Sequence, residues 1–99
     1  MTKDRNRLRL SVTHRLAAEI HGALADRGMS IKELSTKIGE SENFIKRVLV
    51  AEDGIADVVK LSLIADVVWA TAHGIDIYVS PDALVKSTST VKSDTDGND

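Results

Sequence analysis

The sequence predicts a mainly α-helical protein with one small core, and its composition and the spacing of its apolar residues both support this. Hydrophobic residues make up 42% of the 99 residues, whereas aromatic residues make up only 3%, so the core must be built from Leu, Ile, Val and Ala. A chain of this length suffices for a single domain. Apolar residues recur at helical spacing in several stretches that end at glycines. Packed helices therefore fit the sequence better than a β-sandwich.

The first segment, residues 1–12, is basic and is expected to be either a strand or an arm. Leu8, Leu10 and Val12 alternate with polar residues, which is a strand signal. Residues 75–80 alternate in the same way, and an isolated strand would leave its backbone groups unpaired. The two segments could therefore form a small two-stranded β element from residues 7–12 and 75–80, or pair across a dimer. The other interpretation of the first segment is a flexible arm.

The main domain is expected over residues 13–80, beginning with a helix over residues 13–27. Apolar residues from Leu16 to Leu24 fall on one face of this helix, and Gly28 is placed to end it.

The stretch from Ser30 to Leu49 is the most informative part of the chain, because it predicts two short helices joined by a glycine turn. Ser30 can cap the first helix, and Glu33 lies where its side chain can reach back to the Ser30 amide. Gly39 can adopt the left-handed conformation that ends a helix. Ser41 can then cap the second helix at once.

The second of these helices is expected over residues 41–51. It has an apolar stripe that includes Ile45, Val48 and Leu49, while polar side chains point elsewhere. Helices this short are not stable alone, so the rest of the domain must brace them. This is the build of a helix-turn-helix, whose second helix enters the major groove of DNA.

Residues 58–72 are too apolar for a helix that exposes one face to solvent. They predict either two short helices with a bend or one helix buried on two sides, the second side being a subunit interface. Beyond the domain, residues 81–99 are rich in Ser, Thr, Asp and Gly and predict a disordered acidic tail.

Charge is distributed unevenly along the chain, although the formal net charge is only −2. Residues 1–15 carry a balance of +4, and residues 81–99 a balance of −2. The local balance matters more than the total for attraction to a polyanion. The basic start is therefore either a solvated leader or part of a nucleic-acid-binding surface.

With these features in order, the chain resembles the Cro/repressor-type (XRE) helix-turn-helix family over roughly residues 16–77. The likeness rests on MSIKELSTKIG followed by ESENFIKRVL, and on the later stretch LSLIADVV. The resemblance implies a five-helix domain and a dimeric, repressor-like regulator of phage or bacterial transcription that reads double-stranded DNA. The ending GIDIYV also resembles that of some antitoxin-type members.

The second helix of the motif would then supply the base contacts, with Asn43 bonding adenine and Arg47 reaching guanine or phosphate. The residues expected to contact DNA are Ser30, Lys32, Lys37, Ser41, Glu42, Asn43, Lys46 and Arg47. The candidate arm contacts are Arg5, Arg7 and Arg9. The candidate dimer-interface residues are Val67, Val68, Trp69, Ile75, Ile77, Tyr78 and Val79.

A protein-interaction module is the alternative function. Glu40 and Glu42 stand where the family commonly has apolar and basic or amide residues, and an acidic helix start repels phosphate. In that interpretation the scaffold serves a protein partner, or an antitoxin role, and DNA binding is weak or secondary.

Catalysis is not expected from this sequence. It has no cysteine, no phosphate-binding glycine loop and no spacing that suggests a catalytic triad, and His14 and His21 lack a carboxylate pair that would complete a metal site. We therefore expect no enzyme activity, cofactor or metal. No apolar run approaches the ~20 residues of a membrane span, so a cytoplasmic location is expected.

Overall fold

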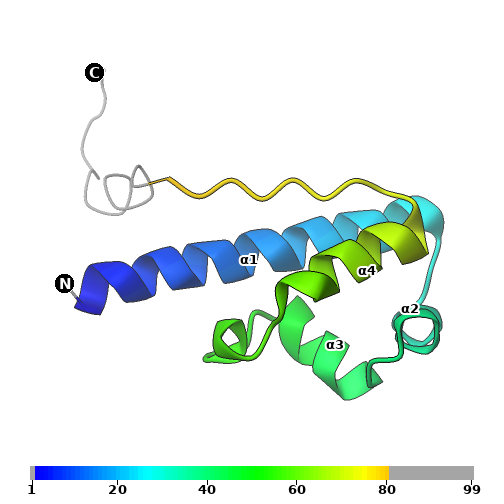
Figure 1. Cartoon of the computed structure of the whole chain (residues 1–99), viewed down its shortest axis with the longest axis horizontal. Helices are drawn as coiled ribbons and strands as arrows, with labels where there is room; N and C mark the ends of the chain where they lie inside the picture. Colours follow the sequence, from blue (N-terminus) through cyan, green and yellow to red (C-terminus); the bar gives the residue numbers. More distant parts are fainter. Residues whose placement is uncertain (1, 81–99) are drawn as a thin grey trace.

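The computed structural model describes residues 2–80, and this part of the chain is mainly helical, as the composition predicted (Figure 1). It contains four α-helices and one short 3₁₀-helix. These are α1 (Thr2–Arg27), α2 (Ile31–Ile38), α3 (Glu42–Leu49), η1 (Ile55–Asp57) and α4 (Leu61–Thr71). The predicted tail over residues 81–99 lies outside the described residues. No helix in the described range is both long and apolar enough to cross a membrane.

The long helix α1 is the spine of the domain, since α3, η1 and α4 pack against it, while α2 packs against α3 and α4. Figure 1 shows α2 and α3 beneath α1, with α4 lying alongside it. After α4 the chain runs in an extended form over residues 73–80, back along α1 toward its N-terminal end. The extended segment and α3 therefore lie on opposite faces of the molecule.

The predicted two-stranded element is wrong, because residues 7–12 belong to α1. The reason is visible in the spacing of Leu8 and Val12, which a helix places on one face as readily as a strand does. Both are half-buried, while Leu10 between them is 47% exposed. Once the helix over residues 13–27 exists, each added turn gains hydrogen bonds at little further cost, so α1 extends to the N-terminus.

Residues 75–80 are extended, but they form no strand ladder with any described residue. Their backbone is instead attached to side chains of α1 at Asp76. The Asp76 N–H donates to Glu19 Oε1 at 2.9 Å, and the Asp76 carbonyl accepts from Arg15 Nε at 3.2 Å. A helix side-chain pair thus replaces the missing strand partner.

The five-helix expectation also needs correction, since residues 2–80 hold four α-helices and the one 3₁₀-helix. The apolar stretch over residues 58–72 does not begin as a helix. Its first three residues continue a loop, and α4 starts only at Leu61 with Lys60 as its N-cap. No side chain caps this helix start.

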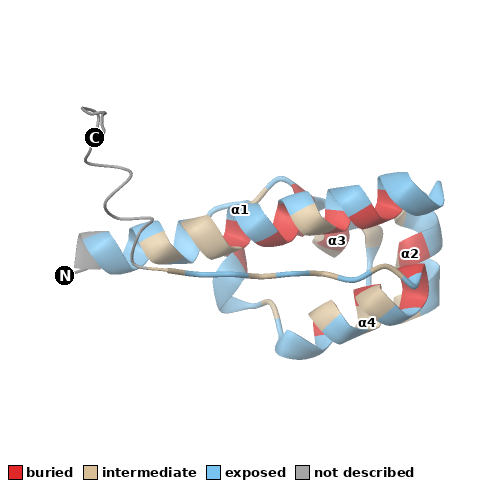
Figure 2. Ribbon diagram, turned by 90° about the horizontal axis from the view of Figure 1, so that it is seen from above, coloured by how far each residue is buried: buried red, intermediate tan, exposed pale blue. Residues whose placement is uncertain are grey.

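The core is formed by aliphatic side chains from all five elements. Its most deeply buried members are Ile20 of α1, Leu34 of α2, Val48 of α3, Ile55 of η1 and Val67 of α4. Figure 2 shows the buried residues of α1 gathered along the side that faces the other helices. Burying each such side chain contributes about 1.5–3 kcal/mol, so this cluster fixes how α2 and α3 sit on α1.

Candidate functional site

The pair of helices α2 and α3 forms as the sequence predicted, beginning with a capping box at Ser30. The Glu33 N–H donates to Ser30 Oγ at 3.0 Å, and the Ser30 N–H donates to Glu33 Oε1 at 2.8 Å. The hydrogen bond from the Ser30 backbone N–H, assisted by the Ser30 side chain, lowers the pKa of the Glu33 carboxyl from its ordinary value of 4.5. The ionised carboxylate is therefore the form that holds the start of α2.

A tight turn joins the two helices at Gly39, whose φ of 76° is left-handed. The N–H groups of Gly39 and Glu40 both donate to the Ser35 carbonyl, at 2.9 and 3.2 Å. The Ser35 hydroxyl donates in turn to the Glu40 carbonyl. Ser41 then caps α3 by accepting from the Phe44 N–H at 3.1 Å. The predicted roles of Ser30 and Ser41 as caps are thus confirmed.

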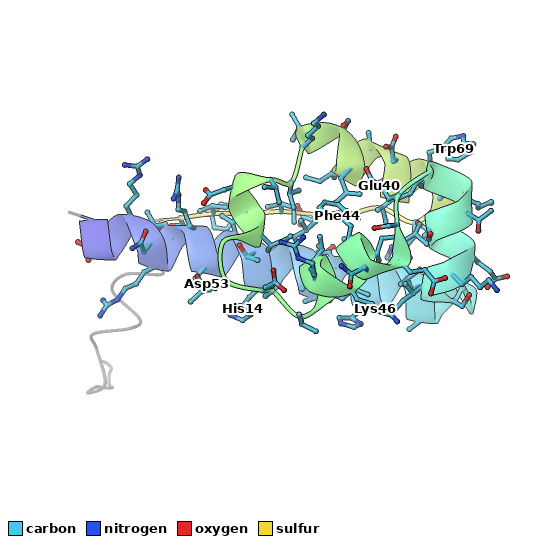
Figure 3. The ribbon with its side chains drawn as sticks, turned by 90° about the horizontal axis from the view of Figure 1, so that it is seen from below. His14, Glu40, Phe44, Lys46, Asp53 and Trp69 are labelled. Atoms are coloured by element: carbon cyan, nitrogen blue, oxygen red, sulfur yellow. The ribbon has the colours of Figure 1, made fainter. Side chains whose placement is uncertain are left out.

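Helix α3 presents one polar stripe to solvent. Asn43 and Lys46 are exposed and Arg47 is partly exposed, whereas Ile45 and Val48 are buried against the core. Figure 3 shows Lys46 on the outer surface of α3. These three polar residues, which we call the α3 stripe, are spaced so that they line one face of the helix.

Arg47 does not project freely from this stripe, because an acidic side chain of the following loop holds it. Its Nε donates to Glu52 Oε2 at 2.7 Å, and the two side chains are 41% and 44% exposed. Lys46, by contrast, forms no ion pair within residues 2–80. Glu52 was not among the predicted site residues. Its spacing of five residues from Arg47 lies beyond the helical i, i+4 rule, so only the loop geometry reveals the pair.

The C-terminal end of α3 is fixed by α1. His21 Nε2 lies 3.2 Å from the Leu49 carbonyl, which can only accept, so this ring nitrogen carries the proton. The contact ties the last turn of α3 to the spine of the domain. Sequence reasoning assigned His21 no role, because the partner is a backbone atom 28 residues away.

Lys37 and Lys32, which were predicted to contact DNA, belong to α2 and not to the α3 stripe. The Lys37 Nζ donates to the Ala70 carbonyl at 3.4 Å and stands 5.9 Å from the centre of the Trp69 ring. Lys37 therefore contacts the C-terminal end of α4. Lys32 is exposed on the first turn of α2. Glu42 starts α3 and is half-buried.

The basic N-terminal segment is helical, so Arg5, Arg7 and Arg9 are carried by a rigid element rather than a flexible arm. Arg9 Nη2 lies 3.4 Å from Asp57 Oδ1 in η1, which fastens this part of α1 to the body. Arg5 and Arg7 are exposed. The structure thus presents a basic helix end, in which Arg9 is paired with a carboxylate.

The candidate dimer residues divide into buried and exposed groups. Val67 is fully buried within the monomer, and Val68 is half-buried. Trp69 is 69% exposed. In the extended segment Ile75 and Ile77 pack against the core, while Tyr78 and Val79 are 71% and 44% exposed. Only the exposed members offer area to a partner.

Comparisons with known proteins do not add to this description. No protein-family model matches the chain, and neither a curated protein nor a solved structure shows significant similarity to it. The function must therefore be argued from the residues themselves.

Proposed function

We propose that this protein is a sequence-specific double-stranded DNA-binding regulator of the Cro/repressor type, acting in the cytoplasm as a dimer. The observation that carries the proposal is the capped helix pair, in which the second helix turns a polar stripe outward. The α2–α3 unit has the build of a helix-turn-helix, and such a motif inserts its second helix into the major groove.

The side chains of the α3 stripe have the chemistry that this role needs. The amide of Asn43, near the start of α3, can donate to and accept from adenine in a bidentate pair. Arg47, one turn later, can bond guanine or phosphate once it leaves Glu52. Lys46 has a free ammonium group for the phosphate backbone. The basic N-terminal end of α1 adds long-range attraction to the duplex.

The test is selection of bound duplexes from a random pool with the purified full chain, followed by anisotropy titrations of the selected sequence. Asn43→Ala and Arg47→Ala should each weaken specific binding by about 1–3 kcal/mol, which is about 5- to 150-fold. Tyr78→Ser is the control, because Tyr78 is 71% exposed and belongs to the extended segment, which lies on the opposite face from α3 (Figure 1). Equal affinity of all four proteins would remove α3 as the reading helix.

A protein-interaction module, including an antitoxin, is the second candidate, and acidic side chains near α3 favour it. Glu40, Glu52 and Asp53 are all exposed around this helix. Carboxylates at these positions oppose the approach of phosphates. The second function replaces the first under two results together. The selection enriches no duplex, and substitutions in the α3 stripe abolish binding to a protein partner.

A further inference from the structure

Helix α4 has an apolar face that is largely exposed, although Lys37 of α2 stands beside the Trp69 ring at one end of it. Leu61 is 83% exposed and Trp69 is 69% exposed, and Ala65 between them is also exposed. The three residues are spaced four apart and so form one line along the helix. Buried Leu63 and Val67 lie on the other side. We call this line the α4 stripe, and Figure 3 shows its tryptophan far from Lys46 of α3.

The α4 stripe has a symmetric order of sizes, large, small and large, centred on Ala65. If two such helices meet antiparallel across a two-fold axis at this alanine, Leu61 of each copy lies opposite Trp69 of the other. The small residue sits where the helices cross, which permits close approach. The stripe is therefore complementary to itself, and a surface with this property fits a second copy of the same chain.

We propose that two copies of this protein associate through their α4 stripes, with the α4 helices antiparallel across an axis at Ala65. The proposal deepens the proposed function by identifying the partner that a two-fold symmetric DNA site requires. The association itself rests on α4 alone and does not depend on DNA.

The absence of charge on the stripe distinguishes a second copy from other occupants. None of its three residues is ionisable, whereas the only acidic residue of α4, Asp66, lies on the flank and is partly buried. Lys37 stands beside Trp69 at one end of the stripe, so a charged partner would meet one cation there but no ionisable group on the three stripe residues themselves. Two copies of the stripe, in contrast, cover apolar surface with apolar surface on both sides.

The expected interface is small, so the dimer should be reversible. An aromatic side chain buries on the order of 150–250 Å² when fully covered, and Trp69 has most of its surface available. A single helix face falls at the low end of specific interfaces, below about 1,200 Å² in total. We expect dimers at high protein concentration that dissociate on dilution.

The experiment is sedimentation equilibrium of the full chain without DNA, from about 1 mM to about 1 μM, a range that spans weak to moderate affinity. Trp69 is the only tryptophan, so its emission reports directly on the stripe. The expected result is a concentration-dependent dimer, with tryptophan emission shifting to shorter wavelength as the dimer forms. A monomer over the whole range overturns the proposal.

Substitutions at Ala65 test the position of the axis. Ala65→Glu and Ala65→Lys should each be monomeric, because like charges would face one another across the axis, while their equimolar mixture should recover the dimer. Tyr78→Ser tests the other exposed candidate for the interface, and it should dimerise like the wild type because Tyr78 lies outside the stripe. Thermal unfolding followed by circular dichroism verifies that each variant is folded, which is expected because Ala65 is exposed.

Two outcomes overturn the stripe as the interface. One is a dimer mass that persists in both single variants at Ala65, and the other is loss of the dimer in Tyr78→Ser. Failure of the proposed function is recognised separately, since it would appear as absence of duplex selection by a protein that still dimerises. Conversely, if a folded, monomeric Ala65 variant still binds one half of the DNA site, dimerisation through α4 and DNA binding by α3 are separate properties.

Discussion

Replacing Glu52 with Gln should make this protein bind its DNA site more tightly, although Glu52 belongs to the loop after α3. The Glu52 carboxylate accepts a hydrogen bond from Arg47 at 2.7 Å. Under the proposed function, Arg47 must exchange this carboxylate for a base or a phosphate. The amide of Gln keeps the shape of the side chain but removes the charge that competes with DNA.

The size of the gain follows from the exposure of the pair. Because the two side chains are 41% and 44% exposed, the ion pair is worth about 0–1 kcal/mol. Removing a negative charge about 10 Å from a phosphate adds about 0.4 kcal/mol in water, and salt reduces this further. The total corresponds to a gain in affinity of about 2- to 10-fold at low salt, with little change in folding stability.

The assay is an anisotropy titration of the selected duplex with the wild type, Glu52→Gln, Arg47→Ala and the double variant. If the ion pair is the cause, Glu52→Gln should tighten binding in the wild type and have less than about a 2-fold effect when Arg47 is absent. Asp53→Asn is the matched control, since this neighbouring carboxylate is exposed and forms no ion pair within residues 2–80.

Two results would refute this reasoning. The first is that Glu52→Gln increases DNA affinity no more than Asp53→Asn does. The gain would then reflect only the loss of a negative charge near the DNA. The second is an equal gain in the Arg47→Ala background, which would show that Glu52 acts without Arg47. Either result would mean that the observed contact does not restrain the arginine during binding.

Two further predictions concern the folding of the α2–α3 unit. Gly39→Ala should destabilise the protein by about 1–2 kcal/mol in urea unfolding, because φ is 76° although an added Cβ would meet no atom within 4 Å. Gly22→Ala, inside α1 with the same free space, should instead stabilise by about 0.5–1 kcal/mol, and the reverse order would contradict the turn geometry. Since folding lowers the pKa of Glu33, its contribution to stability is present above the unfolded value of 4.5 and is lost as pH falls below it. Thermal midpoints of wild type and Glu33→Gln should therefore converge between about pH 6 and pH 3, and a difference that stays constant would contradict the carboxylate as the capping form.

The sequence predicted the α2–α3 unit well because its determinants are local. The caps at Ser30 and Ser41 and the turn at Gly39 involve residues at most five apart, so their chemistry is visible in the linear chain. Alternation over residues 7–12 was misleading for the opposite reason. The choice between helix and strand there depends on whether a neighbouring helix can extend and whether a strand partner exists, and neither is encoded in the segment itself.

The surroundings of the site could not be predicted, because they depend on how distant segments meet. The Lys37 side chain has the positive charge expected of a phosphate contact, but packing of α2 on α4 places it beside Trp69. Val67 is apolar, as a residue of a subunit interface often is, but it is fully buried in the core of the monomer. Tertiary packing thus decides which of several chemically suitable residues remain on the surface, and the interface candidates become fewer once burial is known.

The charge of this protein is compensated locally rather than globally, and this bears on how it would select DNA. Ion pairs shorter than 4 Å join arginines to carboxylates at Arg9–Asp57, Arg15–Glu19, Arg27–Asp26 and Arg47–Glu52. Pairing weakens the field that would attract any duplex from a distance, so non-specific binding should be weak. Exposed pairs cost little to separate, and a duplex that offers Arg47 a partner at the right position can replace the carboxylate. A low net charge is therefore compatible with a specific reader, because the discrimination between sites depends on this exchange and not on the total charge.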